Sequence, residues 1–414
     1  MNFRKIDRRL FTILMIVFVQ MAGASLVLPI LPLYAQRQFK LAPQTITLLV
    51  SSFFAAQFLA GPYIGRLSDR YGRLPVLIIS QIGTAISFAM LGLAQSFEML
   101  FVARVLDGIT GGNIIVAQAY ITDITPREKR TQSLGYIFAA FGLGFIVGPA
   151  LGGALSAAFG PRLPFFIAAL AATATVLLTW LTLDETLSPE QRLANRRVSQ
   201  ASFSPRQIGG NVPLIFILAI AFVGQFALGL LQSTFALYGQ AVLFRGFSEQ
   251  ATNLGIGLLL AFVGLAQFIT QVFLLKRMLR RHREAALVII GGLLRTLGVL
   301  VFAVITTPWL GPLGSVLFAL GMGVMMPSLQ SLATGTVADE LRGGVLGLYQ
   351  SAISLSTIIS TALGGVLFAI GPTMPYWAGA VLSTLSLLPA AVLWRQSRVV
   401  PAQAETAPTP TTPV

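Results

Sequence analysis

Residues 10–36 read LFTILMIVFVQMAGASLVLPILPLYAQ, a run of 27 residues without Asp, Glu, Lys, Arg or His. At about 1.5 Å per helical residue, such a run exceeds the ~30 Å hydrocarbon core of a bilayer. Water is absent from that core, so the backbone amides must pair within the segment, as they do in an α-helix. Further uncharged runs lie at 41–65, 74–97, 131–161, 163–183, 207–244 and 250–275.

Five more apolar segments bring the prediction to twelve transmembrane helices in an all-α membrane protein. They lie at 99–122, 285–305, 309–336, 343–370 and 374–394. Pro and Gly in TTPWLGP (306–312) and GPTMP (371–375) supply turns between neighbouring spans. The alternative is a ten- or eleven-span arrangement with kinked helices. A transmembrane barrel would need alternating segments of about ten residues, which the sequence lacks.

The positive charges predict how these spans are oriented. If the spans alternate in direction, the segments on the side of the N-terminus hold 22 of the 28 Lys and Arg residues. Positive loops stay in the cytoplasm, so we expect a bacterial inner-membrane protein with both termini inside. The net charge of +14 then reflects topology and contact with anionic lipid headgroups. A nucleic-acid partner is not expected, because no basic stripe with interleaved aromatic residues is present.

Composition also argues against several kinds of chemistry. Without cysteine there can be no disulfide, thiol catalysis or thiolate metal site. The sequence has no nucleotide-binding G-x-x-x-x-G-K-[ST] loop, and its single histidine, His282, lies among arginines. We therefore expect no enzyme activity, no cofactor and no bound metal, and energy from an ion gradient. The N-terminal run is too long for a signal peptide and lacks a cleavage site, so it is expected to be the first helix.

An internal repeat divides the chain into two halves. An offset of 212 residues aligns 128–153 with 340–365 without a gap, and places the ladder Gly144, Gly148, Gly152 on Ser356, Ser360, Gly364. Parallel repeats of this kind are a transporter plan, with a substrate site at their interface. We expect a six-helix bundle at 1–185, a cytoplasmic linker at 186–211, a second bundle at 212–395 and a disordered cytoplasmic tail at 396–414.

Three motifs occur in order along the first half. GRLSDRYGRLPVL (65–77) matches G-x-L-x-D-R-x-G-R, RVLDGITGG (104–112) is close to R-x-x-x-G, and GLGFIVGPALGGAL (142–155) is similar to G-x-x-x-G-P-x-x-G-G. On these motifs the chain resembles the major facilitator superfamily, specifically its twelve-span drug:proton antiporter branch. AYITDITPREKR (119–130) and PFFIAAL (164–170) look most like the tetracycline-exporter subgroup. The resemblance implies two pseudo-symmetric six-helix bundles that exchange drugs for protons by alternating access.

The chain also departs from that subgroup. Tetracycline exporters carry acids within spans one and three, where this sequence has Gln20 and Ser87. Asp107 stands where the family commonly has Gln or a small residue. These differences count against tetracycline as the substrate and suggest another route for protons.

Asp107 is the one acid deep within a predicted span, and Arg104 lies three residues earlier on the same helical face. Charged groups inside a bilayer are costly and are treated as functional candidates. Burial favours the neutral acid whereas the guanidinium favours the carboxylate, so the pair is able to exchange a proton. We assign Asp107 and Arg104 to proton coupling; a permanent salt bridge that fixes helix packing is the alternative.

Arg295 lies about eleven residues into span nine, and the spans of the second half contain no acid to pair with it. In the superfamily that this sequence resembles, span nine packs at the periphery of the bundle. A structural role, by snorkelling or by binding a lipid phosphate, is therefore favoured over contact with substrate.

Amides within apolar runs are expected to face the bundle interior or a water-filled cavity. By resemblance, helices one, four, seven and ten line that cavity. Met and aromatic side chains adapt to varied shapes, so a neutral lining suits an amphiphilic organic solute. The expected lining is Gln20, Gln57, Gln118, Gln225, Gln232, Gln330, Tyr34, Tyr120, Tyr238 and Met325. For any single glutamine, a hydrogen bond between helices is the alternative.

Two motifs have mechanical interpretations. By resemblance, the loop motif latches the halves on the cytoplasmic side in the outward-facing state, with Asp69 capping a facing helix and Arg73 bridging Asp69 and Asp123. Its members are Gly65, Asp69, Arg70, Gly72, Arg73 and Asp123. The span-five motif allows close helix approach and a bend. Its members are Gly144, Gly148, Pro149, Gly152 and Gly153.

The sequence thus predicts a monomeric exporter that acts on a small-molecule substrate with protons and membrane lipids as partners. Two rivals remain: a proton-coupled or passive uptake carrier for a sugar, nucleoside or metabolite, and a lipid or lysolipid translocase in which Arg295 holds the headgroup. Because the one cavity carboxylate is paired with Arg104, neutral, zwitterionic or anionic substrates are favoured over lipophilic cations.

Overall fold

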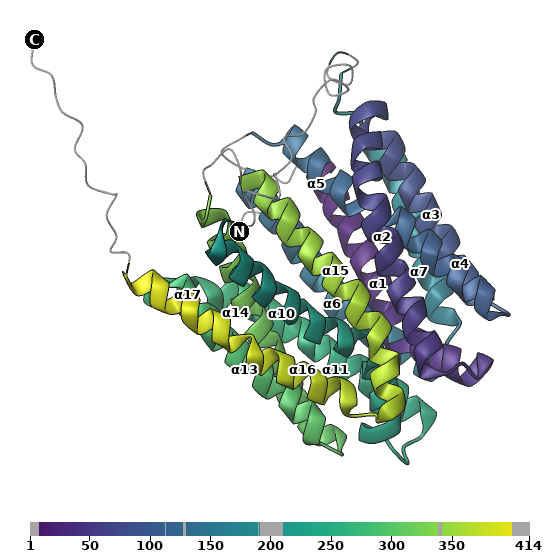
Figure 1. The fold of residues 1–414 in the computed structure, drawn as a ribbon. Coiled ribbons are helices and arrows are strands. Elements are labelled where there is room, and N and C mark those ends of the chain that lie inside the picture. The colour runs from purple at the N-terminus through teal and green to yellow at the C-terminus, as the bar shows by residue number, and fades with distance from the viewer. Residues whose placement is uncertain are drawn as a thin grey trace, which may run out of the picture.

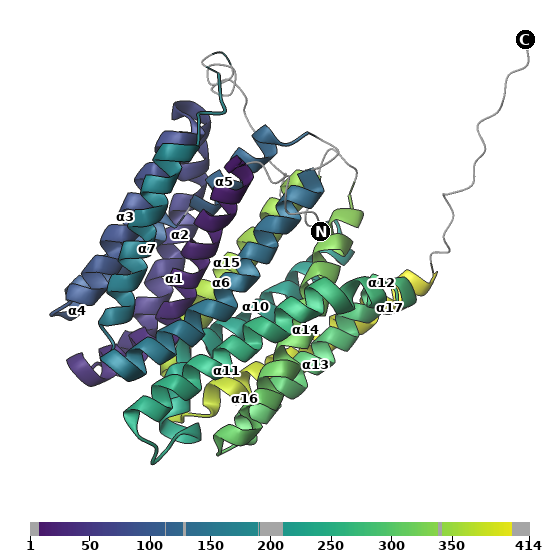
Figure 2. The same ribbon diagram turned by 180° about the vertical axis from the view of Figure 1, so that it is seen from behind.

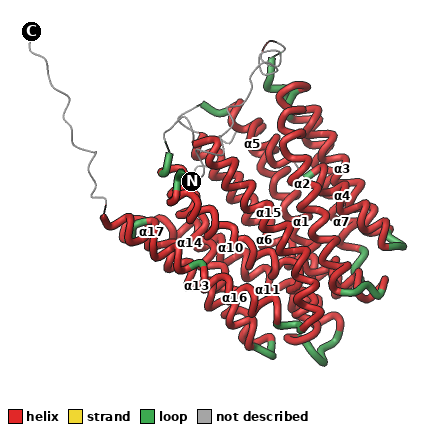
Figure 3. The backbone as a smooth tube through the Cα atoms, viewed as in Figure 1, coloured by secondary structure: helices red, strands yellow, loops and turns green. Residues whose placement is uncertain are grey.

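The computed structural model describes residues 8–111, 113–126, 130–188, 190, 210–337 and 342–399. Within these ranges, 12 helices are long and apolar enough to cross a membrane, which agrees with the predicted twelve rather than ten or eleven. Figures 1 and 3 show the helices side by side in two groups, one from each half of the chain. Most of the predicted linker and tail lies outside the described residues.

The first half contains six spans, and the fourth is described as two helices on either side of residue 112. Gly72, with φ of 112°, separates the second and third spans, a conformation that favours glycine. The side chain of Ser96 caps the fourth span by accepting from the Met99 N–H at 3.4 Å. The helices are α1 (Arg8–Phe39), α2 (Pro43–Tyr71), α3 (Arg73–Leu93), α4 (Phe97–Thr110), α5 (Asn113–Ile124), α6 (Arg130–Phe159) and α7 (Leu163–Thr182).

The second half repeats this order with more irregular helices. Two short π-helices, η3 and η4, extend or interrupt its first two spans, and the last helix reaches past the predicted boundary at 395. The elements are α10 (Val212–Tyr238), η3 (Gly239–Leu243), α11 (Glu249–Ile269), η4 (Thr270–Leu274), α12 (Leu275–Arg281), α13 (Glu284–Val304), η5 (Pro308–Leu310), α14 (Gly311–Gly335), α15 (Arg342–Ile370), α16 (Met374–Leu385) and α17 (Leu387–Val399).

We call the face at which α1 begins the N-side and the face at which it ends the far side. The spans alternate in direction, so the loops that hold most Lys and Arg share the N-side, as the charge pattern predicts. Large apolar side chains cover the outside of the bundle, among them Leu59, Ile79 and Trp180, each more than 60% exposed. Such a surface suits lipid tails rather than water.

The span-five glycines bring α6 against α1 (Figure 2). A Cβ at Gly144 would meet Met21 and Ala22, and a Cβ at Gly148 would overlap Ser25. This close approach lets the Ser25 hydroxyl donate to the Gly144 carbonyl at 3.0 Å. In the second half, α15 packs on α10 in the same way, and the Ser356 hydroxyl donates to the Phe222 carbonyl at 2.6 Å.

The two halves meet through a repeat-related pair of glycines. Gly153 of α6 packs against the backbone of Asn253 and Gly257 on α11, leaving no room for a side chain. Its repeat equivalent, Gly365 of α15, packs against Pro43 and Thr47 on α2, and its N–H donates to the Thr47 hydroxyl at 3.1 Å. We call these two crossings the glycine seam.

The glycine seam closes the far side. Four hydrogen bonds and one ion pair join described residues of the two halves in the far half of the bundle. In both ribbon views the two groups of helices converge there and diverge toward the N-side (Figures 1 and 2). The structure therefore represents a state that is closed on the far side.

Replacing Gly365 with Leu is expected to open the far side, because the new side chain would occupy the space of Thr47 and the Pro43 carbonyl. The natural absence of cysteine permits spin labels at Lys40→Cys and Arg245→Cys, one in a far-side loop of each half. Pulsed electron paramagnetic resonance on this pair of labels should show a population at longer distance in Gly365→Leu than in the parent protein.

Gly347→Leu is the matched control, because Gly347 lies on the same helix and a Cβ there meets nothing within 4 Å in the described structure. A distance distribution in Gly365→Leu that matches both the control and the parent protein would contradict the sealing role of the glycine seam.

Candidate functional site

A buried ion pair lies in the middle of span four. The Arg104 guanidinium donates to Asp107 Oδ2 at 2.7 Å, and the two side chains are 5% and 1% exposed. Phe53 of α2 lies under the guanidinium, 4.2 Å from the ring centroid to Cζ, a cation–π contact. Asp107 Oδ1 and Arg104 Nε are buried without a hydrogen-bond partner among the described residues. The pair is formed as predicted but is only partly satisfied.

Helix α4 ends one turn beyond this pair, and residue 112, just before α5, lies outside the described residues. α4 ends at Thr110 and α5 begins at Asn113. A Cβ at Gly108 would overlap the Phe53 carbonyl, so glycine lets α2 and α4 approach at this depth. The amide of Gln57 reaches the Gly111 carbonyl at 3.5 Å. The close approach of α2 thus places a polar side chain beside the end of α4, one turn from the ion pair.

The predicted glutamines are not equivalent in the structure. Gln20 is buried, Gln118 is half-buried, and Gln225 donates to the Thr357 hydroxyl at 3.0 Å, a bond between α10 and α15. Gln232 is half-buried with its Oε1 unpartnered among the described residues. Gln330 is exposed. Gln57 and Gln225 therefore act as bonds between helices, the alternative that the sequence left open.

The three tyrosines of the predicted lining are packed rather than exposed. Each is at most 2% exposed, and each hydroxyl donates to a backbone carbonyl. Tyr34 donates to Ala94 at 3.2 Å, Tyr120 to Asp184 at 2.9 Å and Tyr238 to Phe302 at 2.6 Å. Met325 is also fully buried. In this state Tyr120, Tyr238 and Met325 are core residues. The resemblance indicated which helices line a cavity, but not which of their side chains face it.

The loop motif forms a cluster within the first half. Arg73 binds Asp69 at 2.6 Å and Asp123 at 3.0 Å, which is the predicted bridge. The helix terminus is capped by Glu185 rather than by Asp69. Glu185 accepts from the N–H groups of Arg73 and Leu74 at the start of α3, at 3.0 and 3.1 Å. Asp69 is drawn to Arg73 one turn along, so an acid from beyond α7 takes the helix terminus. Arg70 is exposed beside Tyr71, Gly72 makes the turn, and Gly65 lies near Ile115.

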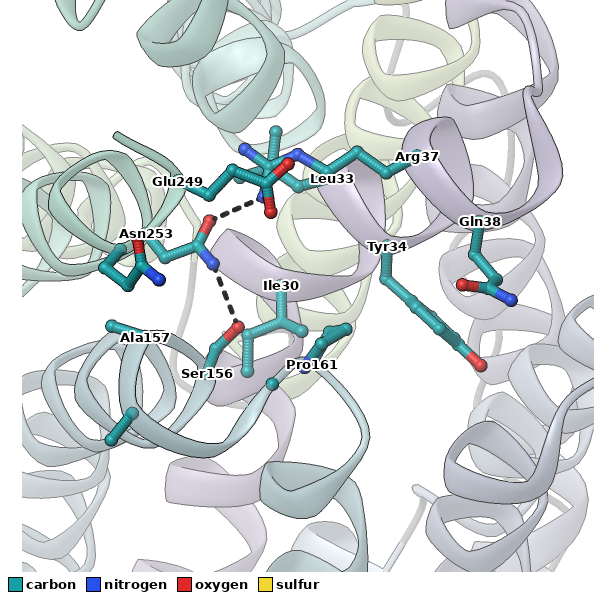
Figure 4. A pocket seen from close by; sticks show the side chains of 13 residues that line it. Ile30, Leu33, Tyr34, Arg37, Gln38, Ser156, Ala157, Pro161, Glu249 and Asn253 are labelled. Atoms are coloured by element: carbon teal, nitrogen blue, oxygen red, sulfur yellow. Dashed lines mark hydrogen bonds and ion pairs between the residues drawn. The ribbon is translucent and has the colours of Figure 1, made fainter. Parts of the chain in front are cut away.

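A cluster of polar residues on the far side was not predicted. Arg37 contacts Glu249 at 3.4 Å and donates to Asn253 Oδ1 at 3.3 Å, and Asn253 donates to Ser156 at 3.3 Å. Figure 4 shows these side chains around a cavity of about 370 Å³ between α1, α6 and α11. We call this set the far-side clasp. Arg37 lies just before the first far-side turn of the first half, and Glu249 lies just after the first far-side turn of the second half. Their opposite charges at these related positions were the one signal in the sequence for this contact.

Arg295 lies on α13 and is 0% exposed. The guanidinium reaches Ser386 Oγ at 3.4 Å, while Nε and NH1 have no partner in the part of the chain that the structure describes. The expected snorkelling toward the membrane surface is wrong, because the side chain points into the second bundle. Its direction follows from Gly224, where a Cβ would overlap NH1.

Comparisons with known proteins point to one family. The family model described as Major Facilitator Superfamily matches residues 13–252 and 230–414. Tetracycline resistance protein, class C, of Escherichia coli is 30% identical over 367 residues, 88% of this chain and 91% of that protein. Multidrug resistance protein 2 of Bacillus subtilis (strain 168) is 27% identical over 374 residues, 88% and 90% of the two chains.

Solved structures show the same fold. The crystal structure of a bacterial homolog to the human lysosomal transporter Spinster, in an inward-facing and unoccupied conformation, superposes with a TM-score of 0.73. That structure is 18% identical, and the match covers 95% of this chain and 98% of the other.

Reversing one charge of the far-side clasp is expected to loosen it. Arg37→Glu would place two carboxylates together. Because the side chains of the original pair are 26% and 74% exposed, we expect the rate of cysteine labelling at the cavity to rise only about two- to five-fold. The measurement is the labelling rate of Leu33→Cys, at the cavity wall, by a maleimide that does not cross membranes.

The double variant Arg37→Glu/Glu249→Arg should restore the parent labelling rate, because it re-forms the pair in the opposite sense. Equal rates in the parent, the single and the double variants would show that the clasp does not hold the far side closed.

Proposed function

Because this chain belongs to the Major Facilitator Superfamily, we propose that it is a secondary active transporter that exports small amphiphilic organic compounds in exchange for protons. The matched relatives named for tetracycline and multidrug resistance support export of this class of compound. The observation that carries the proton coupling is the desolvated Arg104–Asp107 pair within span four.

The pair has two chemically distinct states. With Asp107 ionised, the carboxylate neutralises Arg104 and the site carries no net charge. When Asp107 takes a proton, the attraction weakens and Arg104 becomes an unpaired cation, which is costly away from water. Such a change in local charge at mid-membrane gives each protonation state a preference for one arrangement of the halves, the requirement for coupling protons to a conformational change.

The two arrangements are far-side closed, as in this structure, and far-side open. We propose that the N-side is cytoplasmic and that the protein lies in a bacterial inner membrane as a monomer, with 186–211 linking the bundles. In the far-side open state, Asp69 and Arg73 of the loop motif would contact the second bundle on the N-side. In the present state, these residues bind each other and Asp123, which leaves the N-side free to separate.

The substrate site is proposed between the halves, from the depth of the ion pair toward the N-side. Gln20 and Gln118 supply amides from the first half, and Gln232 supplies one from the second half. The unpartnered Gln232 carbonyl is available to a hydroxyl or amide of the solute. An amide lining fits hydroxyl-rich solutes as well, so an uptake carrier for a sugar, nucleoside or metabolite is the second candidate.

Replacing Asp107 with Asn is expected to abolish proton coupling, because the amide cannot exchange a proton. The protein would be placed in liposomes that contain a pH-sensitive dye and an imposed proton gradient. Tetracyclines, fluoroquinolones, chloramphenicol, dyes, sugars and lysolipids would be added in turn. The parent should show substrate-dependent proton flux opposite to the solute, and Asp107→Asn at least a tenfold lower flux.

Two further variants make the outcome interpretable. Glu98→Gln removes an exposed carboxylate from the first turn of the same helix and should leave the flux unchanged. Arg104→Gln/Asp107→Asn removes both buried charges, so it tests coupling without leaving Arg104 unpaired. Parent-level flux in Asp107→Asn would overturn the assignment of the proton, and flux in the same direction as a sugar or metabolite would establish uptake instead.

A further inference from the structure

The second bundle contains a buried cation for which the proposed mechanism has no use. Arg295 is fully buried on α13, between α10, α14 and the junction of α16 and α17. The salt bridges between described residues do not include it. Moving a guanidinium out of water costs several kcal/mol, an amount normally recovered through a counter-charge. Among the residues that the structure describes, this cation has no counter-charge within ion-pair distance.

The bundle is shaped to hold this guanidinium. A Cβ at Gly224 would overlap NH1, and a Cβ at Gly321 would overlap the backbone of Arg295 itself. Both glycines are needed for α13 to approach α14 and for the side chain to reach α10. A position that requires two glycines on two neighbouring helices is a built site rather than a tolerated accident.

The polar groups around the guanidinium are incompletely used. NH2 reaches Ser386 Oγ at 3.4 Å, at the interruption of the last span. The Ser383 hydroxyl, one turn before on α16, is buried without a partner among the described residues, as are Nε and NH1 of Arg295. The unpartnered groups are two guanidinium nitrogens, which only donate, and one hydroxyl, which can donate or accept, so an anion would satisfy all three.

The cover over NH1 is made of flexible side chains. The methyl groups of Met325 and Met326 approach the same point beside Gly224 as NH1 does. Methionine has three rotatable bonds, so these thioethers can move aside without a backbone shift. Beyond Gly224 lies Gln225, half-buried and bonded to Thr357 of α15, in the region proposed to face the solute.

We propose that Arg295 is the anion-recognising residue of the substrate site and that it binds a carboxylate- or phosphate-type group on an amphiphilic solute. This proposal rests on the proposed transport function and names its substrate class: organic anions and zwitterions. The paired Arg104 and Asp107 leave the first half neutral at this depth, so Arg295 gives the site a net positive charge. A lysolipid headgroup presents the same chemistry as a small organic acid.

The test is direct binding to the purified full chain in detergent, without any gradient. The probes share one ring system: 1-naphthoate, 1-naphthylmethanol and 1-naphthylmethylammonium, with lysophosphatidylglycerol as the lipid. Binding is followed by thermal stabilisation across a concentration series. The parent should bind naphthoate or lysophosphatidylglycerol more tightly than the alcohol and the amine.

Arg295→Met is expected to weaken binding of the preferred anion about 10- to 100-fold, the loss of a charge-assisted hydrogen bond, and to leave the alcohol unchanged. Met removes the buried charge at similar length, so the variant should melt no lower than the parent. Arg295→Lys should keep part of the affinity. Arg245→Met, which removes an exposed far-side cation, should bind every probe as the parent does.

The outcomes separate the possibilities. The anion that loses more affinity in Arg295→Met identifies the source, a small acid or a lipid headgroup. Equal weakening of anion, alcohol and amine, together with a lower melting temperature, would overturn the proposal and assign Arg295 to structure. Because this binding test uses no gradient, its result does not depend on proton exchange at Asp107. Anion binding through Arg295 can be observed even if Asp107→Asn leaves proton flux unchanged, and proton flux can depend on Asp107 even if Arg295→Met leaves anion binding unchanged.

Discussion

The constraint on which this structure depends is the absence of water from the hydrocarbon core. Every backbone amide within the spans must be paired there, which forces helices, and every buried polar side chain needs a partner or carries a penalty. The bundle of membrane-spanning helices meets the first demand, because an α-helix pairs its backbone amides within the segment. The second demand is left unmet at several described side chains, and the charged ones among them are Arg104, Asp107 and Arg295. The first two form the buried pair of the first half, and Arg295 lies in the second half.

Features encoded locally were readable from the sequence, and features that depend on packing were not. The twelve spans follow from uncharged runs, and the Arg104–Asp107 pair follows from a three-residue spacing on one helix. The far-side clasp joins Arg37 to Glu249, residues distant in sequence, so no local pattern indicated it. The inward direction of Arg295 depends on the rotation of α13, which is set by glycines on α10 and α14. Burial of Tyr238 depends on the same packing.

The halves are alike in backbone and different in charge. Repeat-related glycines, Gly153 and Gly365, make equivalent crossings, and repeat-related helices pack in equivalent pairs. Yet the first half buries a neutralised pair, while the second buries a guanidinium that has no ion-pair partner among the described residues. A duplicated scaffold thus provides the symmetry needed for two alternating arrangements, and its interior differs in charge between the halves. In the mechanism proposed above, the first half exchanges the proton and the second recognises the anion.

The glycine seam has a consequence for the rate at which the halves change places. Its contacts are mainly backbone against backbone at van der Waals distance, with one hydrogen bond at Gly365. Dispersion falls off steeply with separation, so a gap of an ångström already removes much of the attraction. The seam therefore resists small displacements and then releases abruptly, without long side chains to disentangle. Such an interface behaves as a switch with two positions, which limits leakage through partly opened states.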